Sequence, residues 1–297
     1  MPRFRSYDTT ELAYHVLGSG PPLVCLPGGP ARASSYLGDL GGLGRDRTLL
    51  RLDLRGSGES AVPEDSASYR CDRLVDDVEA FRLHLGLDRM DLLAHSAGGN
   101  LAELYAARFP DRLTRLVLVT PGLRSVGVET VGFDEAIVAR STEWWYPEAK
   151  AAMEAWQEAA ARGAAPDEVA VLRTRAAPFA YGRWDERARA HVEAEQWEWS
   201  GPAAAGYYAG FAPDVPAVRA ALAELDAPVL IVAGALDPAP TPEAAEALAA
   251  LFPRTEVAVQ EAASHFPWMD DRSRFVKTVL TFLTDERLTN ERLTNER

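Results

Sequence analysis

The sequence is poor in cysteine and lysine, and it has no long apolar run. Its only cysteines, Cys25 and Cys71, suggest neither a disulfide framework nor a metal cluster, so we expect no metal ion and no cofactor. Lysine occurs only at Lys150 and Lys277, and the formal net charge of -13 disfavours nucleic acid and anionic membranes as partners. No apolar stretch reaches the ~20 residues of a membrane span, and no signal peptide is evident. We therefore expect a soluble, cytoplasmic protein, whose oligomeric state the composition does not indicate.

Short apolar segments alternate with amphipathic ones along most of the chain. Continuous apolar runs indicate buried strands, and apolar residues at helical spacing indicate helices packed on them. The predicted strands span residues 4–7, 12–17, 23–26, 47–54, 90–93, 113–120, 228–234 and 255–259, and the predicted helices span 34–40, 69–85, 100–108, 242–251 and 272–283. This alternation predicts an α/β fold, with a mostly parallel central sheet and helices on both faces.

One long segment breaks the alternation. Residues 123–215 contain no convincing strand, are rich in alanine, glutamate and arginine, and hold six of the seven tryptophans. We predict that they form an inserted helical cap, and that residues 1–122 and 216–285 form the α/β core. Residues 286–297 repeat a five-residue unit and are expected to be a disordered tail.

The stretch Ala-His-Ser-Ala-Gly-Gly, residues 94–99, lies between a predicted strand and a predicted helix. A serine in that place, among small residues, has the form of a nucleophile elbow, G-x-S-x-G, with Ala94 in the position of the first glycine. Such a turn raises the hydroxyl of Ser96 above the sheet edge and directs the N–H of Ala97 at a reacting carbonyl oxygen. The alternative is an ordinary strand–loop–helix connection with an incidental serine. Whether the rest of the chain supplies catalytic partners for Ser96 distinguishes the two interpretations.

A serine nucleophile needs a base, and the base needs an acid to orient it. Two histidines follow Ser96: His191 lies within the helical insertion, whereas His265 comes directly after the last predicted strand. Asp237 comes directly after the preceding strand. The carboxyl ends of parallel strands meet at one sheet edge. We therefore predict that Ser96, Asp237 and His265 form a catalytic triad, with Asp270 as the alternative acid.

With these motifs the chain resembles the α/β-hydrolase fold family along nearly its whole length. Residues 53–60 match that family's D-x-R-G-x-G-x-S loop. Residues 26–30, Leu-Pro-Gly-Gly-Pro, resemble the H-G-G-P loop of its proline iminopeptidase group, with proline in place of the histidine. The resemblance implies an oxyanion hole formed by the N–H groups of Gly29 and Ala97. A serine nucleophile also argues against the dehalogenase and epoxide hydrolase branches, which use aspartate.

The resemblance implies a serine hydrolase that forms an acyl-enzyme with a small molecule or short peptide, most simply by removing an N-terminal residue as proline iminopeptidases do. Such an enzyme must pair the substrate's ammonium group with a carboxylate, because an unpaired buried charge is costly. Glu198 lies between Trp197 and Trp199 in the insertion, so we predict that it meets the ammonium and that the tryptophans flank the substrate. Trp145 is a further expected pocket residue.

Two other functions fit the same sequence. One is hydrolysis of small esters, lactones or carbon–carbon bonds by the same residues. The other is a non-hydrolytic role on the same fold, as a ligand receptor or a biosynthetic enzyme, because fold does not determine function. An intact serine, histidine and aspartate set argues against a pure receptor, which has no need of a base and its orienting acid.

Overall fold

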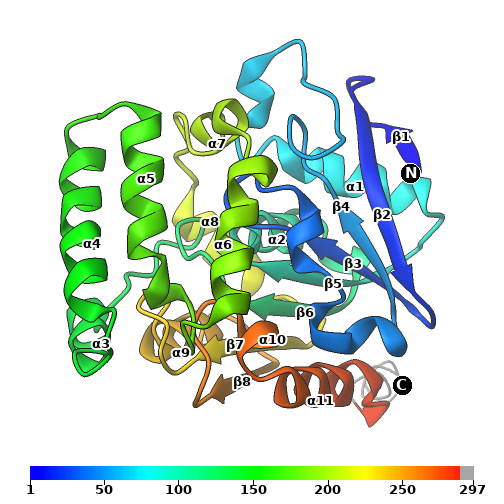
Figure 1. Cartoon of the computed structure of the whole chain (residues 1–297). Helices are drawn as coiled ribbons and strands as arrows, with labels where there is room; N and C mark the ends of the chain where they lie inside the picture. The colour runs from blue at the N-terminus through cyan, green and yellow to red at the C-terminus, as the bar shows by residue number, and fades with distance from the viewer. Residues whose placement is uncertain (288–297) are drawn as a thin grey trace.

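The computed structural model describes residues 1–287, and within them one eight-stranded sheet runs through the molecule (Figure 1). The strand order is β1-β2-β4-β3-β5-β6-β7-β8. The strands are β1 (Arg3–Arg5), β2 (Glu11–Gly18), β3 (Pro22–Leu26), β4 (Thr48–Leu52), β5 (Met90–His95), β6 (Leu113–Val119), β7 (Val229–Gly234) and β8 (Thr255–Gln260). β2 pairs antiparallel with β1 and β4, and all pairs from β4 to β8 are parallel, as predicted.

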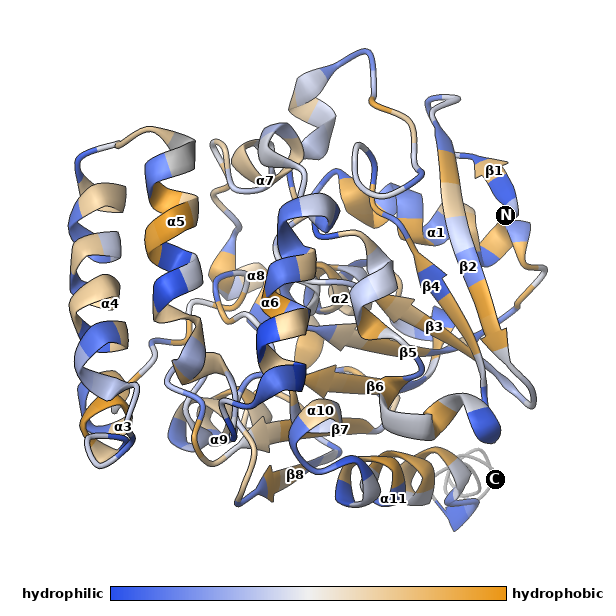
Figure 2. Cartoon of the chain, in the orientation of Figure 1, coloured by the Kyte–Doolittle hydropathy of each residue, from blue (hydrophilic) through white to orange (hydrophobic). Residues whose placement is uncertain are grey.

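Both faces of the sheet are buried, which explains the continuous apolar runs of its central strands. Along β3, Val24 and Leu26 join one core, and Leu23 and Cys25 join a second core on the opposite face. The strands accordingly have hydrophobic colours along their length (Figure 2). The first core packs against α1 (Leu74–His84), α2 (Ala97–Arg108), α8 (Val215–Leu222) and α9 (Pro242–Ala249), and the second against α10 (Pro267–Asp270) and α11 (Arg272–Thr284).

Five helices are inserted between β6 and α8. They are α3 (Phe133–Ala139), α4 (Tyr146–Ala161), α5 (Pro166–Ala176), α6 (Glu186–Glu198) and α7 (Gly201–Tyr207). We call α3–α7 and their connections the cap. The helices α4 and α5 stand side by side at the left of Figure 1 and share a small core with Trp145 and Phe179. The helical character of this insertion agrees with the sequence, whereas the domain boundaries at residues 122 and 215 stay a prediction.

Most predicted elements are present, and 3-10 turns replace all or part of two predicted helices. The predicted helix 34–40 is a short 3-10 helix, η1 (Ser34–Leu37), and the predicted helix 69–85 begins at Leu74, after a separate 3-10 turn, η3 (Ser66–Tyr69), capped by the Asp65 side chain. Among residues 1–287 no helix is long and apolar enough to cross a bilayer. The predicted tail lies, from residue 288 onward, outside the described residues.

Candidate active site

Ser96 sits at the sharp turn between β5 and α2. Its φ of 51° and ψ of -124° are unusual for a residue with a side chain, and such strain clusters at functional sites. Close packing explains the small neighbours. A Cβ on Gly98 would lie 2.6 Å from the carbonyl oxygen of Pro27, and a Cβ on Gly28 would lie 2.8 Å from the Cβ of Ser96. The strand, turn and helix expected of an elbow are therefore all present.

The structure brings the three residues of the predicted triad into one hydrogen-bonded chain. The Nε2 atom of His265 lies 2.8 Å from Oγ of Ser96, and its Nδ1 atom lies 2.7 Å from Oδ2 of Asp237. Asp237 is 2% exposed, and its other carboxylate oxygen accepts the N–H of Ala239 at 3.0 Å. This geometry lets the imidazole take a proton from the serine while the carboxylate orients the ring.

The alternative acid and the alternative base have other partners. Asp270 accepts the N–H of Ser264 at 2.9 Å and is half-buried, and desolvation raises the pKa of its carboxyl. It thus braces the loop before His265 and does not orient the imidazole. His191, on α6, lies 2.7 Å from the hydroxyl of Tyr181, and burial lowers the pKa of its imidazole to about 3.

One predicted oxyanion donor, Ala97, directly follows Ser96, and the other, Gly29, lies in the loop after β3. The N–H of Ala97 is the first of α2, where helix N–H groups have no partner within the helix. In the loop after β3, the N–H of Gly28 is already bonded to the hydroxyl of Tyr36 at 2.7 Å, so Gly29 carries the N–H that this loop can offer. Gly29 lines the cavity together with Ser96 and His265.

His95, directly before Ser96, was not singled out from the sequence. Its Nδ1 lies 2.6 Å from the hydroxyl of Tyr36, and its Nε2 lies 2.9 Å from the carbonyl oxygen of His265. Burial and the nearby His265 hold the pKa of His95 well below its usual value, so its ring is neutral. Since Tyr36 also binds Gly28, this buried pair connects the loop of Gly29 with that of His265. His95 also belongs to the wall of the cavity that holds Ser96.

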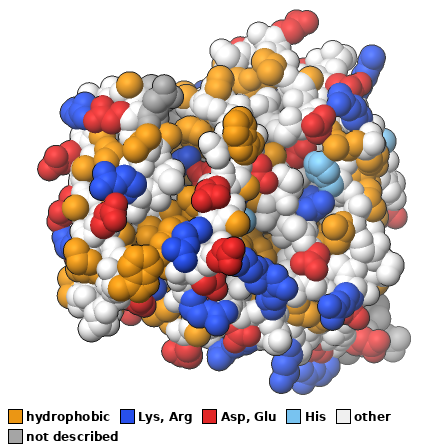
Figure 3. Space-filling view, viewed as in Figure 1, with side chains coloured by type: hydrophobic (Ala, Val, Ile, Leu, Met, Phe, Trp, Pro, Cys, Tyr) orange, Lys and Arg blue, Asp and Glu red, His pale blue; other side chains and the backbone are white. Residues whose placement is uncertain are grey.

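A cavity of about 480 Å³ opens above Ser96, under the cap. Its wall is mostly apolar, and hydrophobic side chains gather between α5 and α6 in the space-filling view (Figure 3). The apolar and aromatic lining residues are Tyr36, Phe133, Met153, Trp156, Ala160, Ala176, Ala177, Phe179, Ala180, Tyr181, Val192, Pro238, Ala239 and Phe266. The charged cap residues on the wall are Arg173 and Glu195, and the core contributes Arg32 and Asp237. The volume suits a small ligand.

The cap tryptophans expected in the pocket do not line this cavity. Trp197 is 84% exposed, because its position on α6 faces solvent. Trp145 is 4% exposed and packs edge-to-face on Phe179, with ring centroids 5.0 Å apart, inside the cap core. The indole N–H of Trp199 donates to the carbonyl oxygen of Pro30 at 2.9 Å, so this side chain contacts the loop after β3. The predictions for these three residues were wrong.

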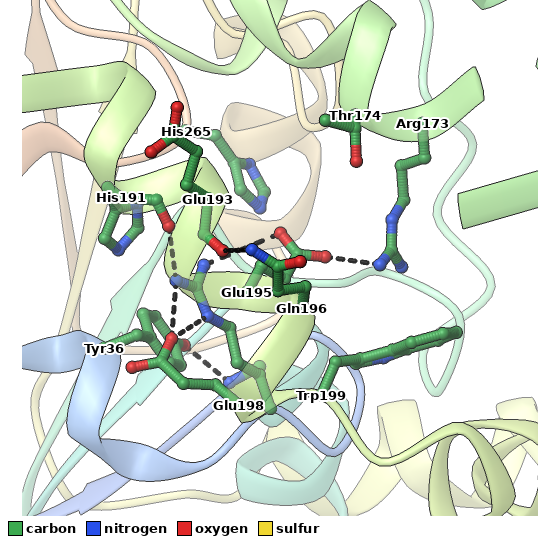
Figure 4. A network of polar contacts seen from close by, with 12 residues as sticks. Tyr36, Arg173, Thr174, His191, Glu193, Glu195, Gln196, Glu198, Trp199 and His265 are labelled. Carbon is green, nitrogen blue, oxygen red and sulfur yellow. Dashed lines mark hydrogen bonds and ion pairs between the residues drawn. The ribbon is translucent and has the colours of Figure 1, made fainter. Parts of the chain in front are cut away.

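Glu198 is also not on the cavity wall. Its carboxylate accepts Nε of Arg32 at 2.8 Å and the hydroxyl of Ser35 at 2.9 Å, so it is already neutralised by a buried arginine (Figure 4). Glu195, one turn earlier on α6, lines the cavity instead and is paired with Arg173 (Figure 4). The predicted ammonium receptor is therefore wrong, and sequence spacing gave no signal for Arg32, which lies more than 160 residues away.

The cap also contacts the loop that carries His265. The N–H of His265 donates to the carbonyl oxygen of Ala180 at 3.0 Å, and the hydroxyl of Ser264 donates to that of Phe179 at 2.7 Å. Thr120, at the end of β6, donates its hydroxyl to the carbonyl oxygen of His265 at 2.9 Å. The base is thus held from both the core and the cap. Among residues 1–287, no cluster of His, Cys, Asp and Glu has the form of a metal site.

The sheet carries a strained serine at the end of β5, and the loops after β8 and β7 carry a histidine and an aspartate. This arrangement is typical of the class of α/β hydrolases. The profile of the alpha/beta hydrolase fold family matches residues 21–271, and the chain belongs to that family.

Several characterised proteins match part of the chain. It is 34% identical to a proline iminopeptidase of Heyndrickxia coagulans over 106 residues, which are 36% of this chain and 37% of that enzyme. It is 35% identical to the human 1-acylglycerol-3-phosphate O-acyltransferase ABHD5 over 109 residues, which are 36% of this chain and 31% of that protein. The match thus spans about a third of the length of these curated relatives.

Solved structures match nearly the whole chain. A thermophilic esterase of Thermogutta terrifontis, with malate bound, is 25% identical with a TM-score of 0.69, covering 95% of this chain and 98% of its own. The esterase RhEst1 of Rhodococcus sp. ECU1013 is also 25% identical, with a TM-score of 0.68 and coverage of 96% and 98%. These structures share the fold over nearly the whole chain.

Proposed function

We propose that the protein is a serine hydrolase that works through an acyl-enzyme. The observation that carries this proposal is the continuous hydrogen-bonded chain from Ser96 through His265 to Asp237, with distances of 2.8 Å and 2.7 Å. In this proposal Ser96 is the nucleophile, His265 the general base and acid, and Asp237 the group that orients the imidazole. Gly29 and Ala97 are the oxyanion donors.

Each step follows from these positions. The oxygen of Ser96 attacks the substrate carbonyl carbon as its proton passes to Nε2 of His265, and the carbonyl oxygen gains a negative charge facing Gly29 and Ala97. Collapse of this intermediate breaks the bond to the leaving group, which takes the proton from His265. Water then attacks the carbonyl carbon of the acyl-enzyme as one of its protons passes to Nε2 of His265. Collapse of this second intermediate breaks the bond to Ser96, which takes the proton back from His265, and the carboxylic acid is released.

The cavity favours a neutral carboxylic ester as substrate. Its wall is mostly apolar, and Glu195, the cap carboxylate on it, is paired with Arg173 and lies 3.7 Å from Arg32. A carboxylate shared by two guanidinium groups is a poor partner for a substrate ammonium, because those groups already neutralise it. We therefore propose that the substrate presents an apolar acyl group to the cap.

Removal of an N-terminal residue is the second candidate. Two observations favour it: the 34% identity to a proline iminopeptidase over 106 residues, and the position of Glu195 on the cavity wall. In that case the ammonium would have to displace Arg173 from Glu195. The similarity to esterases and to an iminopeptidase does not separate the two candidates, so turnover must do so.

The test has two parts. A fluorophosphonate probe should label the protein covalently at Ser96, and labelling should vanish in Ser96→Ala, which a scaffold without a nucleophile would not show. A panel of p-nitrophenyl esters and of prolyl and alanyl p-nitroanilides should then show turnover of the esters. Preference for the anilides would establish the exopeptidase instead. A labelled Ser96 without turnover of either class would reject both candidates, and an unlabelled Ser96 in folded protein would reject the nucleophile.

A further inference from the structure

The loop of Gly29, which follows β3, contacts the cap where α6 ends and α7 begins. The contact, which we call the seam, joins residues 30–35 of the core with residues 198–200 at the end of α6 and the start of α7. Residues Arg32 and Trp199 form an isolated antiparallel bridge there. The hydrogen bonds of the seam that involve backbone atoms are Ala33 N–H to Glu198 O (2.7 Å), Ser200 N–H to Ala31 O (3.2 Å) and the indole N–H of Trp199 to Pro30 O (2.9 Å).

An ion pair reinforces the seam. The side chain of Arg32 is 3% exposed, its Nε donates to Glu198 at 2.8 Å, and its Nη2 donates to the carbonyl oxygen of His191 at 2.8 Å. The guanidinium thus lies between the carboxylates of Glu198 and Glu195 and the backbone of His191, three residues that Figure 4 labels. Removing one partner of a buried pair leaves an uncompensated charge, which is strongly destabilising locally.

Arg32 is directly connected to the proposed oxyanion donor. The backbone N–H of Arg32 donates to the carbonyl oxygen of Gly28 at 3.1 Å, and this hydrogen bond closes the turn that contains Gly29. Gly29 has a φ of +116°, and a Cβ there would lie 2.7 Å from the nitrogen of Arg32, so the two backbones are in contact. A shift of Arg32 therefore moves the Gly29 N–H. On the other side the turn is held by Tyr36, through the N–H of Gly28.

We propose that Glu198 and Arg32 are a positioning pair for the oxyanion hole: the cap, through Glu198, holds the Gly29 N–H where the charge develops on the substrate oxygen. The inference rests on the proposed function, because only acyl transfer uses that N–H. Glu198 touches neither the cavity nor the triad, so it acts on the reaction through Arg32 and the turn. The end of α6 is in this sense part of the catalytic apparatus, although the reacting atoms lie in the core.

The proposal predicts that Glu198→Gln lowers kcat for every substrate and leaves KM nearly unchanged. Loss of one oxyanion donor costs about 10²–10³ in kcat, so a misplaced donor should cost about 10- to 100-fold. The rate of fluorophosphonate labelling should fall in parallel, because phosphonylation uses the same hole. Glu193→Gln is the matched control: Glu193 is exposed on the same helix, outside the seam, and its variant should behave as wild type.

A second variant guards against a general folding defect. Trp199→Phe keeps an aromatic ring under Arg173 and removes only the N–H to Pro30, so it should lower kcat and the labelling rate by roughly 3- to 10-fold with little change in thermal midpoint. A rise in KM confined to amine substrates in Glu198→Gln would overturn the proposal and make Glu198 a binding residue. Wild-type kcat and labelling in both variants would also overturn it. An unlabelled wild-type protein would instead overturn the proposed function.

Discussion

Asp237 has a single strong partner on the reactive side, the Nδ1 atom of His265 at 2.7 Å. An amide in this position would favour the wrong imidazole tautomer, so that Nε2 could no longer accept the proton of Ser96. We expect Asp237→Asn to fold normally and to lower kcat by about 10⁴-fold. Steady-state kinetics on a p-nitrophenyl ester measures this loss.

The control for that prediction is Asp270→Asn, which alters a loop brace and not the imidazole. It should lower the thermal midpoint of unfolding and leave kcat close to the wild-type value. If Asp237→Asn keeps near-normal turnover and Asp270→Asn loses it, Asp270 would be the residue that orients the imidazole.

The site residues that sequence reasoning found share one property: each directly follows a predicted parallel strand. Local patterns fix where Ser96, Asp237 and His265 emerge, because strand ends meet at one edge. Arg32 and Glu198 depend on the docking of a helix more than 160 residues away, which no local pattern encodes. Trp197 was misplaced because residues two apart on a helix face different sides, and Glu195 already faces the cavity.

At the scale of elements, strands and helices were predictable wherever burial was two-sided or periodic, as in β3, β7 and α11. Thr241 caps α9, its side chain accepting the N–H of Ala244, and Pro242 is the first residue of the helix. The start of α1 was not predictable from periodicity, because Tyr69 is apolar and buried but belongs to a separate 3-10 turn. The packing of α6 on the core depends on ion pairs that only the tertiary structure reveals.

Helix α2 contains a buried acid that should make stability depend on pH. Glu103 is fully buried beside the hydroxyl of Ser125, and burial raises the pKa of its carboxyl from 4.5 to about 8. Between these values the folded protein keeps a proton that the unfolded chain has lost, so the free energy of unfolding falls as pH rises. The slope from this group is at most about 1.4 kcal/mol per pH unit.

Glu103→Gln removes this dependence, because the amide is neutral in both states. Relative to wild type, the variant should gain stability from pH 5 to about pH 8 and level off above that, as measured by urea unfolding at several pH values. Glu246→Gln, at an exposed position on α9, is the control and should run parallel to wild type. A constant offset between Glu103→Gln and wild type at all pH values would contradict the titration of Glu103.

At the scale of the whole molecule, the cap and the core together define the volume available to the acyl group. Ala177 lines the cavity of about 480 Å³ from the 3-10 helix η5 (Ala177–Ala180). Ala177→Leu adds about three carbon atoms to this wall. At roughly 0.8 kcal/mol per methylene excluded, kcat/KM for a p-nitrophenyl octanoate should fall about 10-fold or more, with the acetate little affected.

Ala151→Leu is a suitable control, since Ala151 is exposed on α4 and is not part of the cavity wall. The chain-length profile from acetate to octanoate is the measurement. Equal losses on short and long esters in Ala177→Leu would show that the acyl group does not occupy this part of the cavity.

The cap holds the two halves of the site at once: its residues 179–180 bind the loop of His265, and its residues 198–200 bind the loop of Gly29. A cap of this kind is not an interchangeable module. In a chimera that receives the cap of another family member, specificity cannot be transferred independently of rate, because the foreign cap would also have to reproduce these two attachments. We therefore expect substitutions to be tolerated at exposed positions of α4 such as Ala151, and to be costly at residues 198–200. Engineering of new specificity should therefore begin on the α4–α5 pair.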